Sequence, residues 1–516
     1  MDNSAAVENS LDVTNNEKET NQVHPKGLYV CFFTEMWERF SFYGLKALLI
    51  FYLTEHFLFS DQEAASIFGN YFALVYALPL VGGVLADRYL GAKRAVVLGA
   101  VLLCFGHLGM TFEGSAAYIN ESGERVSSTG LTAFYLSLSF IIVGVGFLKP
   151  NISSIVGKLY QVNDPRKDAG FTLFYMGINL GSALAAIICG YVGVTYGWAY
   201  GFGLAGFGML LGLVVFLRGH KHLLGVADAP NEAKLTEPVW FSISREKLIY
   251  LGSLGLVAVV MLLIGNHQLV AGVLGLAFVA IGLWLVWYCL NEVSSEVKQK
   301  LYAAVSLIMM STVFFLCFLQ SGSSMNLFAD RLTDRLVFGL TIPAPMLQSL
   351  NAIFIIMLAP VFAKLWQWLA KHNYCPSTPM KFSLGLLQVG LGFLALVVGL
   401  YFAEGSEQVA LGWLVLAYLL HTTGELCISP IGLSMITKLS APKIVGLMMG
   451  LWFLGSAIAE FIAALLAGQA SMDIAGITSH QSFSLLYQDI MWIALGGALL
   501  TFIMSPLLKR WMGDVV

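Results

Sequence analysis

The chain has 516 residues, of which 58% are apolar and only 11% are charged, and its net charge is −3. About a quarter of the residues in a soluble domain are charged, so this composition and a mean hydropathy of +0.76 indicate a polytopic membrane protein. No basic patch points to nucleic acid as a partner. Residues 1–26 are polar and acidic without an apolar core, which predicts a disordered cytoplasmic tail and not a signal peptide.

Long apolar stretches dominate the chain and predict its fold class. A spanning helix needs about 20 mostly apolar residues, and about fourteen stretches are that long. We expect them to begin near residues 28, 66, 93, 131, 168, 197, 248, 269, 302, 347, 382, 409, 444 and 487. The expected order is a six-helix bundle over 27–218, a cytoplasmic linker over 219–247 with room for a short surface helix, two accessory transmembrane helices over 248–291, and a second six-helix bundle over 292–512. The pattern predicts an all-α integral membrane protein.

The basic residues of the loops predict the orientation of these helices. Counted from a cytoplasmic N-terminus, the inside loops are rich in Lys and Arg, whereas the outside loops hold few basic residues, namely Arg125, Arg331 and Arg335. Short cytoplasmic loops carry an excess of positive charge. We therefore expect both termini on the cytoplasmic side.

A few ionisable residues interrupt the apolar stretches: Glu35, Glu38, Arg39, Lys46, Lys149 and Glu425. A charge at the bilayer centre costs about 2.5–3.5 kcal/mol on insertion scales, so such residues usually face a water-filled path or pair with one another. Glu35 and Arg39 are four residues apart and share a helix face. This cluster is interpreted as a proton-handling group, with a static structural salt bridge as the alternative.

The signs of these charges favour a ligand with two opposite ends. Arg39 and Lys149 lie in the N-terminal half, whereas Asn351 and Glu425 lie in the C-terminal half. A zwitterion needs cations for its carboxylate and an anion with amide oxygens for its amino group. Such a ligand would tie the two halves together.

Several longer motifs carry a family resemblance. The stretch Gly83–Val84–Leu85–Ala86–Asp87–Arg88, continued by Tyr89–Leu90–Gly91–Ala92–Lys93–Arg94, resembles the first cytoplasmic loop of the major facilitator superfamily. The first-helix sequence Glu35–Met36–Trp37–Glu38–Arg39–Phe40–Ser41–Phe42–Tyr43–Gly44 resembles the first-helix signature of proton-dependent oligopeptide transporters. Residues 171–182, residues 424–434 and Phe147–Leu148–Lys149–Pro150–Asn151 are similar to further motifs of that family.

The combination resembles the bacterial proton-dependent oligopeptide transporter family. The resemblance implies two six-helix bundles that rock about a central site, here with two accessory helices. It implies a symporter in the bacterial inner membrane that imports di- and tripeptides, with protons and the lipid bilayer as further partners. The proton gradient supplies the energy, and no cofactor, metal or covalent chemistry is expected. A homo-oligomer is left open.

The resemblance also implies roles for individual residues. The peptide carboxylate is expected near Arg39 and Lys149, and the amino group near Asn179, Asn351 and Glu425. Tyr43, Tyr76 and Trp452 are expected to form the aromatic lining of the site. Tyr175, in the motif of residues 171–182, and Ser429, in the motif of residues 424–434, are also expected to bind the substrate. Proton coupling is assigned to Glu35, Glu38, Arg39 and Lys149. Lys46, Asp87 and Arg88 are expected to act in gating, with a charge latch at Asp87 and Arg88; a plain positive-inside anchor is the alternative for that loop.

One departure from the family pattern affects the coupling. Many members carry an acid directly before a Gln in the seventh helix, but here Leu319 precedes Gln320. Lys46 therefore lacks the acidic partner that the family pattern implies, which shifts the coupling to the first helix. Glu460 is unexplained, with an interhelix hydrogen bond as the default, and His107 and His421 are expected to be hydrogen-bonded core residues.

Two other functions are weighed. The first is a transporter of the same fold for another solute, such as nitrate, an amine, a drug-like or an amino-acid-like compound. The second is a membrane-embedded enzyme, which the scattered histidines disfavour. Retention of both Lys149 and Glu425 favours a zwitterion over a simple anion.

Overall fold

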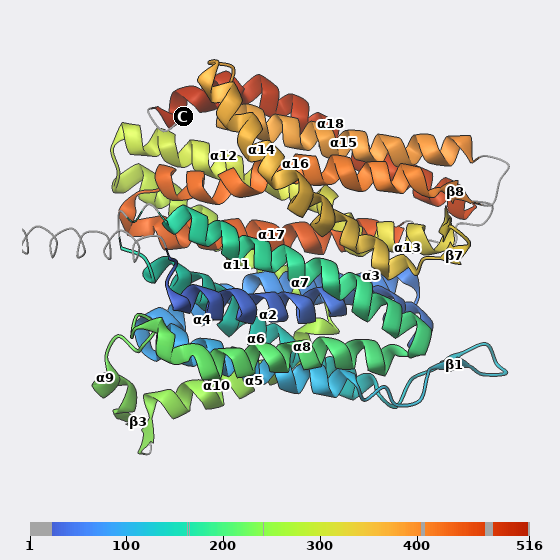
Figure 1. Cartoon of the computed structure of the whole chain (residues 1–516), viewed down its shortest axis with the longest axis horizontal. Coiled ribbons are helices and arrows are strands. Elements are labelled where there is room, and N and C mark those ends of the chain that lie inside the picture. The colour runs from blue at the N-terminus through green and yellow to red at the C-terminus, as the bar shows by residue number, and fades with distance from the viewer. Residues whose placement is uncertain are drawn as a thin grey trace, which may run out of the picture.

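The chain folds into two groups of long helices that run side by side (Figure 1). The computed structural model describes residues 23–161, 164, 166–240, 242–403, 408–469 and 478–513. The N-terminal half forms one group and the C-terminal half forms the other, and their helices run along the long axis of the molecule.

The N-terminal bundle consists of α2 (Lys26–Phe51), α3 (Asp61–Ala77) with its continuation α4 (Pro79–Leu85), α5 (Gly91–Met110), α6 (Leu131–Lys158), α7 (Lys167–Tyr196) and α8 (Trp198–Gly219). Shorter elements connect them: the π-helical turns η1 (Tyr52–His56) and η2 (Ala86–Leu90), the 3-10 turn η3 (His220–Leu223) and the hairpin of β1 (Tyr118–Ile119) and β2 (Arg125–Val126). The 3-10 turn leads out of the bundle into the linker.

The linker contains the short helix α9 (Glu232–Thr236) and the antiparallel pair β3 (Pro238–Trp240) and β4 (Ile243–Ser244). The accessory helices are α10 (Arg245–Ile264) and α11 (His267–Asn291). Their connecting turn touches both bundles. Asn70 of α3 donates a hydrogen bond to the Ile264 carbonyl oxygen at 2.8 Å, and the His267 ring stacks on Phe461 of α17 (Val445–Gln469) with centroids 4.3 Å apart.

The C-terminal bundle consists of α12 (Ser295–Phe318), α14 (Ser349–Lys371), α15 (Thr378–Phe402), α16 (Leu411–Leu439), α17 and α18 (Ser479–Met512). Its short elements are the 3-10 turns η4 (Leu319–Gly322), η5 (Ala344–Gln348) and η6 (Pro442–Ile444), the helix α13 (Ser324–Arg331), and the strands β5 (Thr333–Asp334), β6 (Leu336–Val337), β7 (Leu340–Thr341) and β8 (Val409–Ala410). The strands pair as β5 with β8 and β6 with β7. Between the bundles, α17 packs along α3 and α14 packs along α7.

The number of spans agrees with the predicted fold class. Twelve helical stretches in the described chain are long and apolar enough to cross a membrane. They leave out α2, which carries four intramembrane charges, and they join Asp61–Met110 into one stretch. That stretch contains two spans, α3 with its continuation α4 and then α5, which begins at Gly91, whose φ of +74° a residue with a Cβ rarely adopts. Counting α2 and dividing the stretch at Gly91 brings the described spans to fourteen.

Several helices begin earlier than the apolar pattern predicts. The second span starts at Asp61 and not near residue 66, because the Ser60 side chain accepts a hydrogen bond from the Glu63 amide in a capping box. The last span starts at Ser479 and not near residue 487, with Thr478 and Gln481 in the same arrangement. Polar caps therefore extend both helices beyond their apolar parts. Of the predicted tail, residues 1–22 lie outside the described chain, and Lys26 already belongs to α2.

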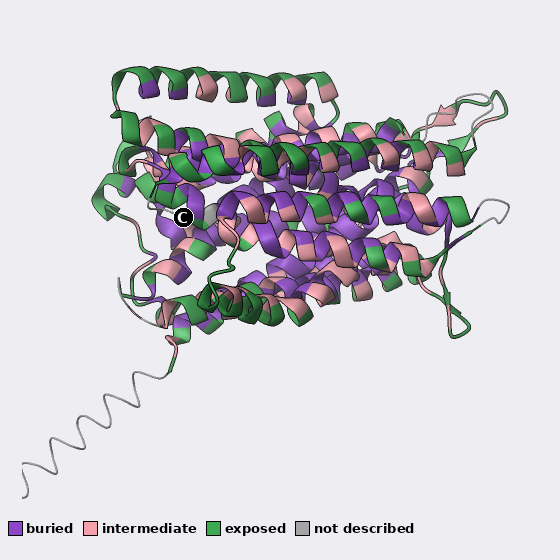
Figure 2. Cartoon of the chain, turned by 90° about the horizontal axis from the view of Figure 1, so that it is seen from above, coloured by how far each residue is buried: buried purple, intermediate pink, exposed green. Residues whose placement is uncertain are grey.

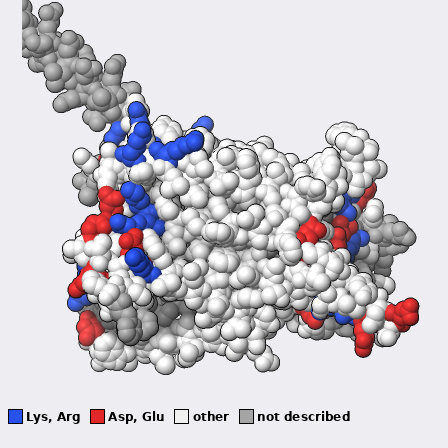
Figure 3. Space-filling model, turned by 90° about the horizontal axis from the view of Figure 1, so that it is seen from below, with Lys and Arg blue, Asp and Glu red and all other residues white. Residues whose placement is uncertain are grey.

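The surface of the molecule matches a bilayer. Buried residues gather where the helices pack on one another, and exposed residues follow the outer faces (Figure 2). On the face shown in Figure 3, Lys, Arg, Asp and Glu gather at the two ends of the helices and leave an uncharged band between them. Large apolar side chains such as Leu276 and Leu283 of α11 are 73% and 68% exposed. Such a band fits lipid, and the protein is a multi-pass membrane protein.

Glycine residues allow helices of the bundles to cross at short distance, and Gly181 does so where α7 crosses α2. A Cβ on Gly181 of α7 would lie 2.2 Å from the Met36 carbonyl oxygen of α2, so Gly181→Val should separate the two helices. Overpacking of this kind costs about 1–3 kcal/mol. We expect a lower thermal unfolding temperature for the purified variant in detergent.

The matched control for this prediction is Gly275→Val in α11, where a Cβ would meet nothing within 4 Å. This control should unfold like the wild type. Equal unfolding temperatures for the two variants would contradict close packing at the α2–α7 crossing.

Candidate functional site

A buried charge cluster lies on α2. The Arg39 guanidinium donates from Nη2 to Glu38 Oε1 at 2.6 Å and from Nε to the other Glu38 oxygen, and its Nε lies 3.3 Å from Glu35 Oε1. All three residues are at most 4% exposed. The predicted partner Glu35 is therefore present, but the neighbouring Glu38 makes the shorter contacts. Two carboxylates share one guanidinium, which leaves an excess negative charge in the cluster.

Lys149 of α6 lies beside this cluster, and its ammonium group has aromatic rings as neighbours. Its Nζ lies 4.6 Å from the Tyr76 ring centroid and 5.9 Å from the Phe42 ring centroid, while Arg39 lies over the same Phe42 ring at 4.7 Å. Both cations thus lie near the Phe42 ring. In the part of the chain that the structure describes, Lys149 has no carboxylate within ion-pair distance, so its ammonium group is available to a ligand.

The C-terminal bundle supplies an amide and a carboxylate. Asn351 of α14 donates from Nδ2 to Glu425 Oε2 and to Thr422 Oγ1, both on α16, at 3.1 Å each. One turn further along α16, the Ser429 hydroxyl oxygen is buried and has no hydrogen-bond partner among the described residues. Glu425, Asn351 and Ser429 therefore form a polar group with unused hydrogen-bonding capacity.

Aromatic residues connect the two halves of the site. Tyr43 of α2 is close enough to both Arg39 and Glu425 to interact with their charges, and Tyr175 of α7 interacts with both Glu425 and Tyr43. Tyr175 is 39% exposed. The two tyrosines thus lie close to charged residues of both bundles, Tyr43 to Arg39 and Glu425 and Tyr175 to Glu425.

Two further residues expected to bind the substrate, Asn179 and Trp452, do not lie openly exposed at the site. Asn179 is buried and donates to the Tyr175 carbonyl oxygen at 3.0 Å within its own helix, so a ligand would have to replace this bond. Trp452 is 7% exposed. A Cβ on Gly432 would lie 2.3 Å from the Trp452 ring, so this indole is wedged at the α16–α17 crossing.

Lys46, which lacks the acidic partner implied by the family pattern, pairs with a different carboxylate. Its Nζ lies 3.4 Å from Glu460 Oε1 of α17, and both side chains are buried. This contact is the interhelix hydrogen bond expected by default for Glu460. The only signal in the sequence was a charge in each of two apolar stretches, 414 positions apart, and nothing in the sequence linked the two.

The predicted charge latch at Asp87 and Arg88 is not formed in this structure. Both residues are exposed in η2, and neither makes an ion pair within the described ranges of the chain. The ion pairs come from the next turn. Lys93 Nζ lies 3.8 Å from Asp228, and Arg94 lies 2.7 Å from Glu232 and 3.1 Å from Glu246.

These pairs bind the start of α5 to the linker and to α10. The hydrogen bond from Arg94 lowers the pKa of the Glu232 carboxyl, which keeps the linker end of this contact ionised. In the described structure, the basic loop of the superfamily motif therefore holds the linker, and a gating role for Asp87 and Arg88 stays a prediction.

The two intramembrane histidines lie outside this group of residues. His107 of α5 and His421 of α16 are at most 1% exposed, which confirms that they are core residues. The predicted hydrogen bond of His107 is wrong, because neither of its ring nitrogens has a partner among the described residues. His421 packs against Phe393 with ring centroids 4.8 Å apart.

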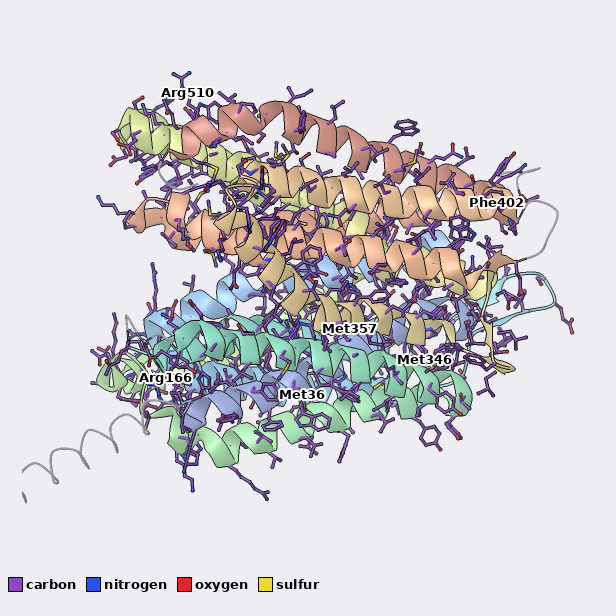
Figure 4. All side chains as sticks on the ribbon, turned by 45° about the horizontal axis from the view of Figure 1, so that its top comes forward. Met36, Arg166, Met346, Met357, Phe402 and Arg510 are labelled. Atoms are coloured by element: carbon purple, nitrogen blue, oxygen red, sulfur yellow. The ribbon has the colours of Figure 1, made fainter. Side chains whose placement is uncertain are left out.

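The bundles are joined at one end of the molecule. Arg331 at the end of α13 forms a bidentate pair with Asp61 at the start of α3, with Nη2 2.7 Å from Oδ1. Figure 4 places Met346 of η5 toward this end, and Arg166 and Arg510 at the opposite end of the N-terminal and C-terminal bundles. The charge cluster on α2 lies near Met36, which is between the two ends.

Comparison with known proteins agrees with the sequence resemblance. The POT family matches residues 93–480. The chain is 35% identical to the "Peptide transporter YePEPT" of Yersinia enterocolitica over 87% of this chain and 89% of the relative, and 37% identical to the "Uncharacterized transporter YclF" of Bacillus subtilis over 96% of both. A crystal structure of a peptide transporter POT in complex with sulfate is 35% identical, with a TM-score of 0.80 over 95% of this chain and 96% of that chain. Sequence and fold agree over nearly the whole length, and the chain therefore belongs to the POT family.

Proposed function

We propose that this protein is a symporter that imports di- and tripeptides together with protons across the bacterial inner membrane, with both termini in the cytoplasm. The observation that supports this most is the division of charge between the bundles. The N-terminal bundle presents Lys149, which has no carboxylate partner among the described residues, beside Arg39, and the C-terminal bundle presents Glu425 with Asn351. The peptide transporters among its relatives support the same substrate class.

The two charged groups suit the two ends of a peptide. The peptide carboxylate pairs with Lys149 and Arg39, whereas the peptide amino group pairs with Glu425 and replaces the hydrogen bond from Asn351. The tyrosines between them contact the peptide without selecting its side chains, since apolar and aromatic walls set shape while a few polar groups fix orientation. A bound peptide links the bundles, which rock about it to give alternating access.

Proton coupling is assigned to the shared guanidinium of the α2 cluster. When a peptide carboxylate draws Arg39 or Lys149 toward it, Glu35 or Glu38 loses part of its compensating charge and takes a proton. The proton enters from outside and leaves on the cytoplasmic side after the peptide is released. Each proton contributes about 2.3 kcal/mol per 100 mV of membrane potential, and no cofactor is needed.

Uptake of labelled dialanine into proteoliposomes tests this function. Wild-type protein should accumulate dialanine when an inward proton gradient is applied. Lys149→Ala should lose both accumulation and counterflow exchange, because the ligand carboxylate loses its cation. Glu35→Gln and Glu38→Gln should lose accumulation, with exchange retained in at least one of them, because exchange needs no net proton movement.

Two controls make the outcome specific. Glu124→Gln, on the exposed β1–β2 loop, should behave like the wild type. A second candidate substrate, 5-aminolevulinic acid, is included as a competitor because a 30% identical POT structure with a TM-score of 0.78 holds it. Exchange of that compound without any exchange of dialanine by folded protein would replace the peptide assignment by the alternative zwitterion.

A further inference from the structure

An ion pair of buried residues joins the two bundles. Lys46 of α2 and Glu460 of α17 face one another at 3.4 Å, with side chains 7% and 1% exposed. Taking two charges out of water is costly, and a pair of this kind is retained only where its geometry offsets the loss of solvation. In a transporter whose bundles move apart and together, a buried pair between the bundles cannot keep the same environment throughout the cycle.

The Lys46 side chain runs along η4 to Glu460, and η4 is the turn in which Leu319 stands in place of the family acid. A Cβ on Gly322 of η4 would lie 2.6 Å from Lys46 Cε, so the stem of Lys46 passes directly along η4. Leu319 opens this turn and is buried. The next residue, Gln320, donates from Nε2 to the Ala463 carbonyl oxygen of α17 at 2.9 Å. Glu460 lies one helical turn before Ala463, so α17 places a carboxylate next to η4.

Charged and titratable groups from three elements, α2, α6 and α3, lie near Glu460, and a fourth element, α11, contacts the neighbouring residue. Lys46 on α2 forms the ion pair, Lys149 on α6 acts on the carboxylate at longer range, and Tyr76 on α3 is close enough to interact with it. His267 on α11 stacks on Phe461, the next residue of α17. Lys46 alone among these makes direct contact with the carboxylate in the described structure, so it decides whether Glu460 is paired.

We propose that Glu460 is a proton-binding carboxylate of the C-terminal bundle, and that it takes over in α17 the place of the acid absent at Leu319. The proposal rests on the proton-coupled function above. When the bundles part at the Arg331–Asp61 end, Lys46 leaves and Glu460 takes a proton from the outside water. When that end closes, Lys46 returns, displaces the proton toward the cytoplasm and forms the ion pair described here.

The test separates proton-driven accumulation from counterflow exchange of dialanine in proteoliposomes. Glu460→Gln should exchange dialanine like the wild type but lose one coupled proton. Loss of one proton lowers the steady-state accumulation about 50-fold at a potential of about 100 mV. The double variant Leu319→Glu/Glu460→Gln places a carboxylate in η4, next to the Lys46 side chain. Its accumulation of dialanine should recover to the wild-type level.

A second variant guards against misfolding. Glu460→Gln leaves Lys46 buried without a partner, whereas Lys46→Met/Glu460→Gln removes both charges. The double variant should fold, retain exchange and show the same lowered accumulation as Glu460→Gln.

Each contrary outcome has a distinct meaning. Wild-type accumulation by either Glu460→Gln or Lys46→Met/Glu460→Gln would overturn the assignment of a proton to Glu460. Loss of exchange together with accumulation in all three variants would show that the pair is structural, which also overturns it. If the folded wild-type protein exchanges no dialanine, the peptide function itself fails, and this result is distinguishable because it appears before any substitution is made.

Discussion

Arg39→Gln is expected to abolish dialanine transport and to destabilise the protein by several kcal/mol. Arg39 forms ion pairs with two buried carboxylates, those of Glu35 and Glu38, on the same helix α2. Removing one member of a buried ion pair costs about 3–5 kcal/mol, because the remaining charge loses its partner without regaining water. Two unpaired carboxylates would remain here.

The measurement is thermal unfolding of the purified variant in detergent, together with counterflow exchange in proteoliposomes. Arg39→Lys keeps a positive charge but loses the planar fork that contacts both carboxylates, so it should fall between the wild type and Arg39→Gln. Arg125→Gln, which removes a cation packed over Phe59 outside the site, is the matched control.

An unchanged unfolding temperature for Arg39→Gln would contradict the buried cluster. Normal stability with lost exchange would show that Arg39 binds the ligand and does not hold the carboxylates in place. The two readouts therefore separate the structural role of Arg39 from its role toward the substrate.

Glu425→Gln is expected to remove the preference of the protein for a free amino group. Glu425 is the carboxylate that the C-terminal bundle presents beside Asn351, and a neutral glutamine side chain cannot form an ion pair with an ammonium group. Truncating one partner of a buried charged hydrogen bond costs about 2–5 kcal/mol, which is at least about tenfold in affinity. Dialanine should therefore compete at least about tenfold less well for exchange.

The comparison compound is N-acetyl-dialanine, which has the same carboxylate but no charged amino group. In the wild type it should compete far less well than dialanine, and in Glu425→Gln the two compounds should compete almost equally. Lys149→Ala provides a separate control, because it should exchange neither dialanine nor its acetylated form. A Glu425→Gln variant that still prefers dialanine over its acetylated form would place the amino group elsewhere.

Much of the fold was accessible from the sequence because membrane insertion is a local constraint. Each spanning helix must be apolar over its own length, so hydropathy alone indicated the spans and the two accessory helices. Helix starts were less accessible. The caps at Ser60 and Thr478 are polar, and hydropathy does not detect hydrogen bonds to backbone amides.

The site was accessible only in part. Charges in apolar stretches are costly, so the sequence by itself indicated Glu35, Glu38, Arg39, Lys149 and Glu425 as candidates, and the helical period placed Glu35 with Arg39. It could not show that Glu38 makes the shorter contacts with Arg39, that Arg39 and Lys149 both lie near the Phe42 ring, or that Asn351 reaches Glu425. Side-chain rotamers and helix packing decide these contacts.

The pairing of Lys46 with Glu460 shows the limit most clearly. The sequence alone determined that the chain spans the membrane many times, that it carries opposite charges in its two halves, and that Leu319 stands where an acid is expected. Only the tertiary structure brought α17 beside α2 and η4, and so gave Lys46 a carboxylate from another bundle. The physical reason is that burial makes each charge need a partner, whereas the packing of distant helices decides which residue becomes that partner.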